Sequence, residues 1–455
     1  MQGGISVKTG TSQPTGGENI NIGSNGTGHI QRQFLRYVLQ NIFGMLGMSA
    51  YVLADTIFIA RSAGTNGITA LNLVLPIYNL IYAFGAMTGV GSATRYKILA
   101  AQKNPESRHF FTNALLCTTL IGLPFMLLGV LNPALVLHIM GADAEITAAG
   151  LSYTRIFMCF APFFMWNQVF NAFVRNDDDP TLAMIATFSS SVFNVIFDYV
   201  LMFPLGLGMA GAALATAFSP IVGIGICLLH FRKKENHIRF QLQLPSLHRF
   251  LISARLGFSS FIGELSNGVT TVVFNALILA LAGNVGVAAY GVIANINIVA
   301  IAIFNGVAQG SQPLMSDAHG RADRHAVKQL LVYAAATAEI LAVFMLFLLN
   351  LFPTPISALF NSEGNAEMTA YAVRGIRLYF IGLLFASFNI AASGFLSATD
   401  RAIEAFAASI LRGLLGIILL APLLSAVLGM TGVWLAVPAT ELLCSLLIGW
   451  FLRKK

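Results

Sequence analysis

Charged side chains are scarce in this sequence. Only 10% of its 455 residues are Asp, Glu, Lys or Arg, whereas a soluble domain carries roughly 25%. Hydrophobic residues make up 56% of the chain and the mean hydropathy is +0.75. Apolar runs of about 20 residues recur from residue 34 onward, and each can cross a bilayer about 30 Å thick as a helix. The sequence therefore predicts an all-α, polytopic membrane protein.

Cysteine is also rare, and the common catalytic motifs are missing. The four cysteines are Cys117, Cys159, Cys227 and Cys444. They lie in apolar runs without the spacing of metal ligands, so we expect neither disulfides nor a metal site. No HExxH, phosphate-loop or Ser/His/Asp pattern and no selectivity-filter motif is present. The sequence therefore favours neither an enzyme nor an ion channel, and we expect no cofactor.

The N-terminus lacks the apolar core of a signal peptide. Its first stretch, MQGGISVKTGTSQPTGGENINIGSNGTG, is rich in Gly, Ser, Thr and Asn. Because such a composition buries too little apolar surface to fold, we predict that residues 1–30 form a disordered cytoplasmic tail.

Twelve apolar spans are predicted, and the longest polar connection, residues 232–250, lies between the sixth and the seventh. The spans lie near 34–60, 70–93, 110–131, 149–172, 181–203, 211–231, 251–281, 286–311, 329–351, 373–396, 402–424 and 432–452. We therefore predict an N-terminal bundle at 31–231, a cytoplasmic inter-bundle loop at 232–250 and a C-terminal bundle at 251–455.

Short sequence echoes support two related halves. GMAGAALATAFS at 208–219 resembles GMTGVWLAVPAT at 429–440, and AGTNGITAL at 63–71 resembles AGNVGVAAY at 282–290. The two echoes have nearly the same spacing along the chain. Repeated halves are typical of transporters, in which the substrate path lies between the halves near the bilayer midplane.

Positive charge is concentrated in every second loop. The positive loops carry Arg95, Lys97, Lys103 and Arg108; Arg232, Lys233, Lys234, Arg239, Arg249 and Arg255; Arg321, Arg324 and Lys328; and Arg453, Lys454 and Lys455. The opposite loops contain Asp143, Glu145, Glu363 and Glu367. Since loops rich in Lys and Arg face the cytoplasm, both termini are predicted to be cytoplasmic. This bias explains the net charge of +7, so we expect no nucleic-acid partner.

Three stretches resemble a known family. They are LADTIFIARSAGTNGITALNLVLPIYN (53–79), FVRNDDDPTLAM (173–184) and FNVIFDYVLMFPLGLGMAGAALAT (193–216). They are similar to the first and second spans, the loop between spans 4 and 5, and the span 5–6 region of the multidrug and toxic compound extrusion (MATE) family. The resemblance implies a V-shaped fold of two pseudo-symmetric six-helix bundles. It also implies the export of amphipathic, often cationic compounds against a proton or sodium gradient.

The resemblance also implies a cation-coupling site in the N-terminal bundle. In the prokaryotic branch this site has an Asp in span 1, an Asn and an Asp in span 5 and a Thr in span 6. The matching residues are Asp55, Asn194, Asp198 and Thr216. Other members place the site in the C-terminal bundle, with a Glu in span 7, matched by Glu264, and an Asp in span 10, which has no match near residues 386–387. Many members have a Pro near the start of span 1, where this chain has Gln40, so no proline kink is carried over.

Asp198 needs a physical reason, because a carboxylate near the bilayer centre costs about 2.5–3.5 kcal/mol on insertion. Asn194 precedes it by one helical turn, so both lie on one face. Two carboxylates with amide and hydroxyl oxygens suit either a bound Na⁺ or a held proton. The alternative for Asp198 is an interhelical hydrogen bond. Glu264 either contacts substrate or ion, or pairs with Asn267 or Arg255.

Other polar residues receive structural predictions. Arg412 opposite Glu339 or Glu441 would form an ion pair within the membrane. The run Asp177-Asp178-Asp179 precedes Pro180 and is expected to cap the span that follows.

These observations predict a secondary active multidrug efflux antiporter in the cytoplasmic membrane. It would export small amphipathic, cationic compounds in exchange for H⁺ or Na⁺, and a two-carboxylate pair favours H⁺ because it can work by protonation alone. We expect a monomer surrounded by lipid. The alternative is a lipid-linked oligosaccharide flippase of the same superfamily, which would need a basic central cavity, whereas the deep charges here are mostly acidic.

Overall fold

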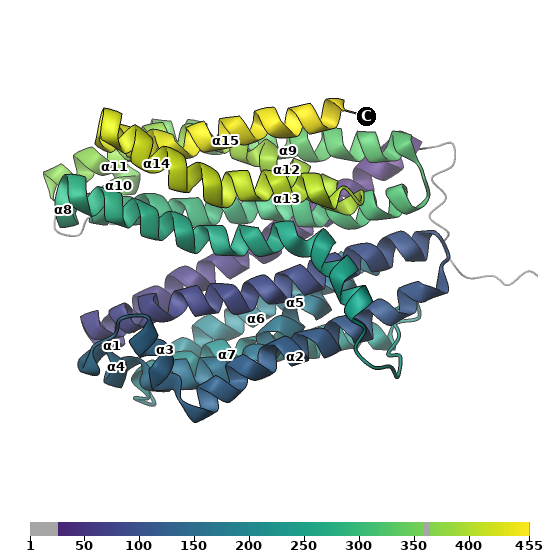
Figure 1. The fold of residues 1–455 in the computed structure, drawn as a ribbon, viewed down its shortest axis with the longest axis horizontal. Helices are drawn as coiled ribbons and strands as arrows, with labels where there is room; N and C mark the ends of the chain where they lie inside the picture. Colours follow the sequence, from purple (N-terminus) through teal and green to yellow (C-terminus); the bar gives the residue numbers. More distant parts are fainter. Residues whose placement is uncertain (1–25, 359–364, 455) are drawn as a thin grey trace, which may run out of the picture.

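Two groups of helices lie side by side in the computed structural model, which describes residues 26–358 and 365–454 (Figure 1). No β-strand occurs in these ranges. The helices are α1 (Gly26–Ala101), η1 (Pro105–His109), α2 (Phe110–Leu131), α3 (Pro133–Ile139), α4 (Ala144–Cys159), α5 (Ala161–Asn176), α6 (Pro180–Met202), α7 (Gly208–Cys227), η2 (Leu228–Arg232), α8 (Leu247–Gly320), α9 (Arg324–Leu351), α10 (Pro353–Ala358), α11 (Ala366–Tyr379), η3 (Phe380–Gly382), α12 (Leu383–Ala398), α13 (Ala402–Ile410), η4 (Leu411–Leu415), α14 (Gly416–Leu428) and α15 (Met430–Arg453).

The twelve predicted spans are confirmed in their order along the chain. In the described ranges, ten helical segments are long and apolar enough to cross a membrane, and α4 with α5 forms a further span bent by 48°. The helix α8 counts once among the ten, although Gly283 interrupts it with φ 59° and ψ −157°. Glycine adopts this conformation at no steric cost. Its two arms, 247–282 and 284–320, are separate spans, which completes the twelve.

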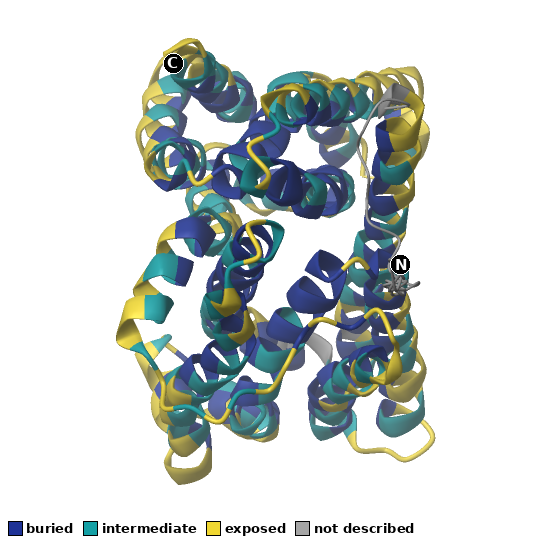
Figure 2. Ribbon diagram, turned by 90° about the vertical axis from the view of Figure 1, so that its right-hand side faces the viewer, coloured by how far each residue is buried: buried dark blue, intermediate teal, exposed yellow. Residues whose placement is uncertain are grey.

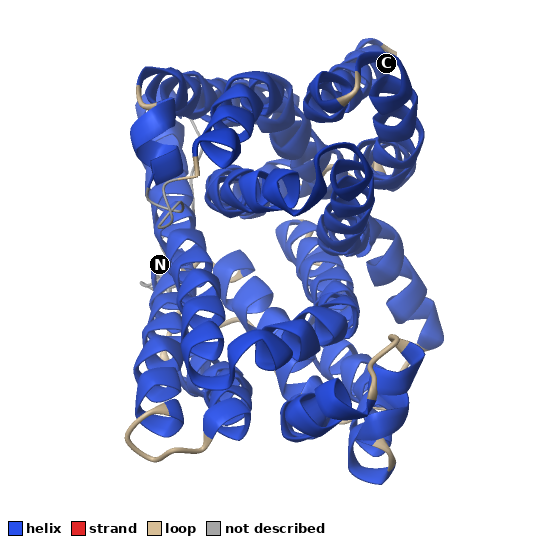
Figure 3. Ribbon diagram, turned by 90° about the vertical axis from the view of Figure 1, so that its left-hand side faces the viewer, coloured by secondary structure: helices blue, strands red, loops and turns tan. Residues whose placement is uncertain are grey.

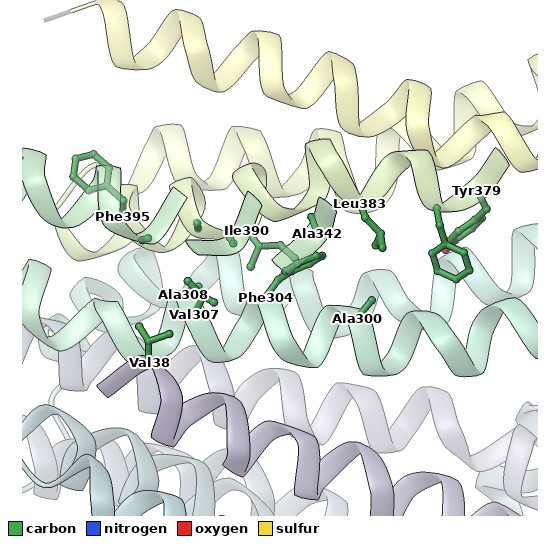
Figure 4. Close-up of a cluster of buried hydrophobic side chains, with 14 of the residues drawn as sticks. Val38, Ala300, Phe304, Val307, Ala308, Ala342, Tyr379, Leu383, Ile390 and Phe395 are labelled. Carbon is green, nitrogen blue, oxygen red and sulfur yellow. The ribbon is translucent and has the colours of Figure 1, made fainter. Parts of the chain in front are cut away.

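Helices α1–α7 form one bundle and α8–α15 the other (Figure 1), and Figure 3 shows the helical molecule from its end. The core of the C-terminal bundle includes Phe304, Ala342, Leu383 and Ile390 (Figure 4). Figure 2 shows that exposed residues lie on the outer faces of the helices, and many of them are large and apolar, such as Leu131 at 78% exposure. A surface of this kind suits contact with lipid chains.

The sequence echoes correspond to repeated local structures. Gly208 and Gly429 have positive φ values of 51° and 59° and stand at the starts of α7 and α15. Three residues later, Gly211 packs on the backbone of the preceding helix, and Gly432 does the same in the second half. Each half therefore turns sharply on a glycine before its last span.

The start of α1 differs from the expected tail. Residues 1–25 lie outside the described part of the chain, but α1 already begins at Gly26, within the predicted tail of residues 1–30. Gln40, at the place of the family's proline, donates to Oγ1 of Thr181 at 2.8 Å. Glu363, assigned above to an outer loop, also lies outside the described residues.

Three consecutive aspartates join α5 to α6, and each has its own set of partners. Asp179 caps α6 as predicted, since its carboxylate accepts a hydrogen bond from the backbone N–H of Leu182 at 3.3 Å. Asp177 instead accepts hydrogen bonds from the Tyr96 hydroxyl at 2.6 Å and the His230 ring at 2.8 Å. Asp178, with φ 64°, accepts two hydrogen bonds from Lys97 at 2.8 Å.

Candidate functional site

Three helices of the N-terminal bundle bring four polar side chains together. Asp55 comes from α1, Asn194 and Asp198 from α6, and Thr216 from α7. All four side chains are buried, and Asn194 and Asp198 are 0% exposed. Nδ2 of Asn194 donates to Oγ1 of Thr216 at 3.3 Å, and the carboxyl groups of Asp55 and Asp198 lie next to each other. The residues named from the sequence thus form one cluster.

The spacing of polar residues along α6 explains how this cluster forms. Ser190 and Ser191 precede Asn194 by four and three residues, and Asp198 follows it by four, so all of them share the buried face of an otherwise apolar helix. The Ser190 hydroxyl donates to the backbone oxygen of Ser219 in α7 at 2.6 Å. Such hydrogen bonds between helices fix α6 against α7, and this contact places Thr216 opposite Asn194.

Several oxygen atoms in the cluster have no cationic, amide or hydroxyl donor. Within the described residues these are Oδ1 of Asp55, Oδ1 of Asn194 and both carboxyl oxygens of Asp198. A hydrogen bond between two carboxyl groups requires a proton on one of them. Without that proton, two buried anions side by side need a counter-charge. Carboxylate, amide and hydroxyl oxygens are ligands that hard cations prefer, so the cluster suits either a held proton or a metal cation such as Na⁺.

Sequence reasoning did not identify the tyrosines around this cluster. The Tyr153 hydroxyl of α4 lies beside Thr216. Tyr51, one helical turn before Asp55, shares a hydrogen bond of 3.0 Å with the hydroxyl of Tyr78, whose ring stacks on that of Tyr82 at 4.5 Å. Tyr51 and Asp55 are four residues apart, as are Tyr78 and Tyr82, so the sequence already placed each of these pairs on one helix face. These tyrosines supply hydroxyls and apolar faces beside the two carboxylates.

Glu264 lies outside this cluster, on the first arm of α8. In the described part of the chain, neither Asn267 nor Arg255 forms a hydrogen bond or ion pair with it. Its carboxylate does interact electrostatically with Tyr82 of the other bundle. Three residues earlier, Phe261 packs against Phe84 of α1 with ring centroids 5.1 Å apart. Glu264 therefore lies close to the boundary between the two bundles.

The C-terminal bundle contains an ion pair within its spans. Nε of Arg412 lies 2.6 Å from Oε1 of Glu441, which confirms the predicted intramembrane pair with Glu441 as the partner. Asn389 donates to Oε2 of Glu441 at 2.7 Å. Arg412 belongs to a π-helical turn, Leu411–Leu415. Glu339 has a different partner, because it accepts a hydrogen bond from the Ser387 hydroxyl at 2.8 Å.

The charges of the α5–α6 turn, outside the spans, are held in their ionised forms. Burial opposes the ionisation of Asp177, but hydrogen bonds from His230, His237 and Tyr96 outweigh it and keep the Asp177 pKa below its usual range. Burial likewise opposes the ionisation of Asp179, yet hydrogen bonds from His230 and Lys233 lower its pKa to about 2. This turn is therefore anionic at neutral pH and fixes α6 to the end of α7.

The chain matches a known family over most of its length. A family model described as MatE matches residues 41–200 and 260–421. Two relatives, both named multidrug export protein MepA, come from Staphylococcus saprophyticus and Staphylococcus aureus. They are 25% and 26% identical to this chain, covering 92% and 93% of it and 94% of each relative.

Two solved structures have the same fold. One is described as the outward-facing conformation of a multidrug resistance MATE family transporter of the MOP superfamily, with a TM-score of 0.87, 21% identity and coverage of 93% of this chain and 95% of that one. The other is a MOP superfamily transporter from Pyrococcus furiosus, for which a reversed polarity of the binding pocket is said to suggest a different function. Its TM-score is 0.85 at 21% identity, with coverage of 93% and 95%.

Proposed function

This chain belongs to the MatE family of transporters, since the family model matches well over half of it, and we propose that it is a multidrug efflux antiporter of the cytoplasmic membrane. It exports small amphipathic, cationic compounds in exchange for H⁺ or Na⁺. Relatives named multidrug export proteins support the export of drug-like compounds.

The cluster of Asp55, Asn194, Asp198 and Thr216 is the observation that carries this proposal. It lies within the apolar spans, it brings two acids into contact, and several of its oxygens lack a donor. A site of this kind binds positive charge in two forms, as the coupling cation or as a cationic substrate. The two compete for the site. Each form favours a different arrangement of the bundles, which is how exchange arises in a two-state transporter. A membrane potential of 100 mV supplies about 2.3 kcal/mol for each charge that moves inward.

The bundles and the orientation of the chain are part of the same proposal. Residues 31–231 and 251–455 act as the two moving bundles, and residues 232–250 join them on the cytoplasmic side. Both termini are cytoplasmic, because the loops at the end that carries the C-terminus hold most of the Lys and Arg residues. The transporter acts as a monomer.

The test is drug efflux from proteoliposomes under an imposed proton or Na⁺ gradient. We expect efflux to follow one of the two gradients, with H⁺ favoured, and Asp198→Asn to abolish the response. The control is Asp143→Asn, because exposed Asp143 caps α4 at 2.8 Å and Asn is an equally good cap. Undiminished, gradient-dependent efflux by Asp198→Asn would reduce Asp198 to a helix-packing residue.

A comparison with Glu264 separates coupling in the N-terminal bundle from coupling in the other. Glu264→Gln should reduce transport less than Asp198→Asn does at equal expression, because Glu264 has no second carboxylate in contact with it in the described residues. An equal or greater loss in Glu264→Gln would move the coupling site to the C-terminal bundle.

The rival reading, a lipid-linked oligosaccharide flippase, predicts a different substrate charge. A pyrophosphate headgroup needs cationic side chains, whereas the cluster contains two acids. If the same proteoliposomes move a lipid-linked sugar and leave cationic dyes in place, the flippase reading replaces the multidrug one.

A further inference from the structure

The end of the molecule that carries the C-terminus is closed by direct contact between the bundles. The start of α1 packs on the second arm of α8, where a Cβ added at Gly310 would lie 2.8 Å from Cα of Val38. The second span of α1 packs on the first arm of α8, where a Cβ added at Gly91 would collide with the backbone of Ser253. Glycine at these positions lets the helix backbones meet. We call these two contacts the seams, and the bundles separate at this end only if both open.

One buried cation bridges the first seam. Arg175, at the end of α5, is only 6% exposed. Its Nη1 donates to Oε1 of Gln309 in the C-terminal bundle at 3.0 Å and to Oδ1 of Asn41 in the N-terminal bundle at 3.3 Å. Within the described residues its Nε has no acceptor and no carboxylate forms an ion pair with it. The guanidinium therefore holds its full charge against neutral amide oxygens alone.

The other polar contacts across the seams are also weak. Gln312 donates to Oγ1 of Thr94 at 3.0 Å, which is a bond between two neutral groups. Arg95 and Asp400 lie 3.6 Å apart with side chains 27% and 52% exposed. An exposed pair at this distance contributes little because water screens it. The contacts made by Gln312 and Arg95 thus contribute little to holding this end closed.

The strong ion pairs of this region lie within the N-terminal bundle instead. Asp178 forms an ion pair with Lys97, and Asp179 forms one with Lys233. These carboxylates follow Arg175 by three and four residues in the chain, yet neither pairs with it. The bundle that contains Arg175 is therefore tied together by close ion pairs, whereas between the bundles Asp317 of α8 attracts Lys97 only from beyond ion-pair distance.

We propose that Arg175 and Gln309 form a latch across this end, held weak by the neutral acceptor so that it opens in every transport cycle. Burial of an arginine without a carboxylate is costly. Opening the seam gives the guanidinium water in exchange for its hydrogen bond to the Gln309 amide, so the closed and open states stay close in free energy. The cytoplasmic position of the latch, and the cycle that it serves, rest on the proposed function. The hydrogen bond between Arg175 and Gln309 does not depend on that function.

Changing one acceptor atom tests the latch. Gln309→Glu keeps the shape of the side chain and gives Arg175 a carboxylate at the same place, so it should favour the closed state. The reporter is Ser253→Cys in a chain whose four native cysteines are replaced. Ser253 is 1% exposed, and its Oγ has no partner within the described residues. A maleimide therefore labels this position only when the seams open.

We expect Gln309→Glu to slow labelling of the purified protein about tenfold, the size of effect that a new close charge pair produces. Gln309→Met removes the acceptor and should speed labelling. In an Arg175→Gln background, Gln309→Glu should no longer slow it. The matched control is Gln329→Glu on α9, where Gln329 donates to Tyr333 at 2.8 Å and both residues belong to the C-terminal bundle. It should leave the rate unchanged.

Three results obtained with the two latch residues would overturn the latch. They are unchanged or faster labelling in folded Gln309→Glu, slowing that persists in the Arg175→Gln background, and no acceleration in Gln309→Met. The labelling rate of Gln309→Met still tests the latch if Gln309→Glu fails to fold. No substrate or ion gradient enters the measurement, so a wrong proposed function leaves this result unaffected. Equal slowing in Gln329→Glu would also contradict the latch.

Discussion

The two bundles treat buried carboxylates in opposite ways. In the N-terminal bundle, Asp198 has another acid, Asp55, as its neighbour. In the C-terminal bundle, Glu441 is neutralised by Arg412 and also accepts a hydrogen bond from Asn389. One arrangement is unstable unless a cation arrives, and the other is complete. The first suits a site that changes its charge, and the second suits a fixed element of structure.

This contrast predicts opposite effects on stability. Glu441→Gln should lower the free energy of unfolding by about 1–3 kcal/mol, less than the loss on breaking a fully buried pair because Arg412 remains 23% exposed. Asp198→Asn should leave stability unchanged or raise it, since it removes one of two adjacent acids. Thermal unfolding of the purified variants measures both. A larger loss in Asp198→Asn than in Glu441→Gln would mean that Asp198 is a structural residue.

The pKa of Asp179, lowered to about 2, predicts a pH dependence at the α5–α6 turn. A group with a lowered pKa stabilises the fold above its unfolded value of 3.8, and this stability is lost as the pH falls through about 2. The difference in melting temperature between the native protein and Asp179→Asn should be constant between pH 5 and 6, below the titration of its partner His230, and shrink below pH 4. A difference that stays unchanged down to pH 2 would assign the effect to a group other than the Asp179 carboxylate.

At the scale of elements, glycine decides how closely helices pack. A Cβ at Gly432 would collide with the backbone of Leu424, whereas one at Gly449, on the same helix α15, would meet nothing within 4 Å. Replacing either Gly432 or Gly449 by alanine makes the same chemical change in the same helix. The steric environment is therefore the main difference between them.

Gly432→Ala should destabilise the protein by about 1–3 kcal/mol, the usual effect of overpacking. Gly449→Ala should be neutral or stabilise by up to about 1 kcal/mol, because alanine has the higher helix propensity. Thermal unfolding in detergent distinguishes the two. Equal melting temperatures would show that α14 and α15 separate to make room at little cost.

Elements were easier to predict than the contacts between them. Long apolar runs and polar connections are local features, so the spans could be read directly, and the kink in α8 falls between the two spans predicted there. The cluster of Asp55, Asn194, Asp198 and Thr216 could be named because a buried acid is costly and the family motif is specific. Tyr153 could not be named, because a tyrosine in an apolar run is ordinary and only the fold brings its hydroxyl to Thr216. The bond from Arg175 to Gln309 joins distant parts of the chain and left no local pattern.

For the whole molecule, orientation in the membrane follows from charge. We expect Lys234→Cys, in a chain without other cysteines, to resist a membrane-impermeant maleimide in intact cells. Ala144→Cys should react, because both positions are exposed but Ala144 begins α4 beside an acidic loop, whereas Lys234 lies in a basic one. Labelling of permeabilised cells shows that each cysteine is reactive in principle. The reversed pattern in intact cells would invert the orientation and with it the direction of transport.

The glycine turns that begin α7 and α15 stand at the same place in two halves of six spans each. Because six is an even number, a chain of one half would begin and end on the same side of the membrane. Two copies of such a chain would insert in the same orientation and face each other across an axis along the membrane normal. Gene duplication and fusion could therefore join them without inverting either half. On this history, the acid pair of one half and the ion pair of the other are the divergent descendants of a symmetric dimer.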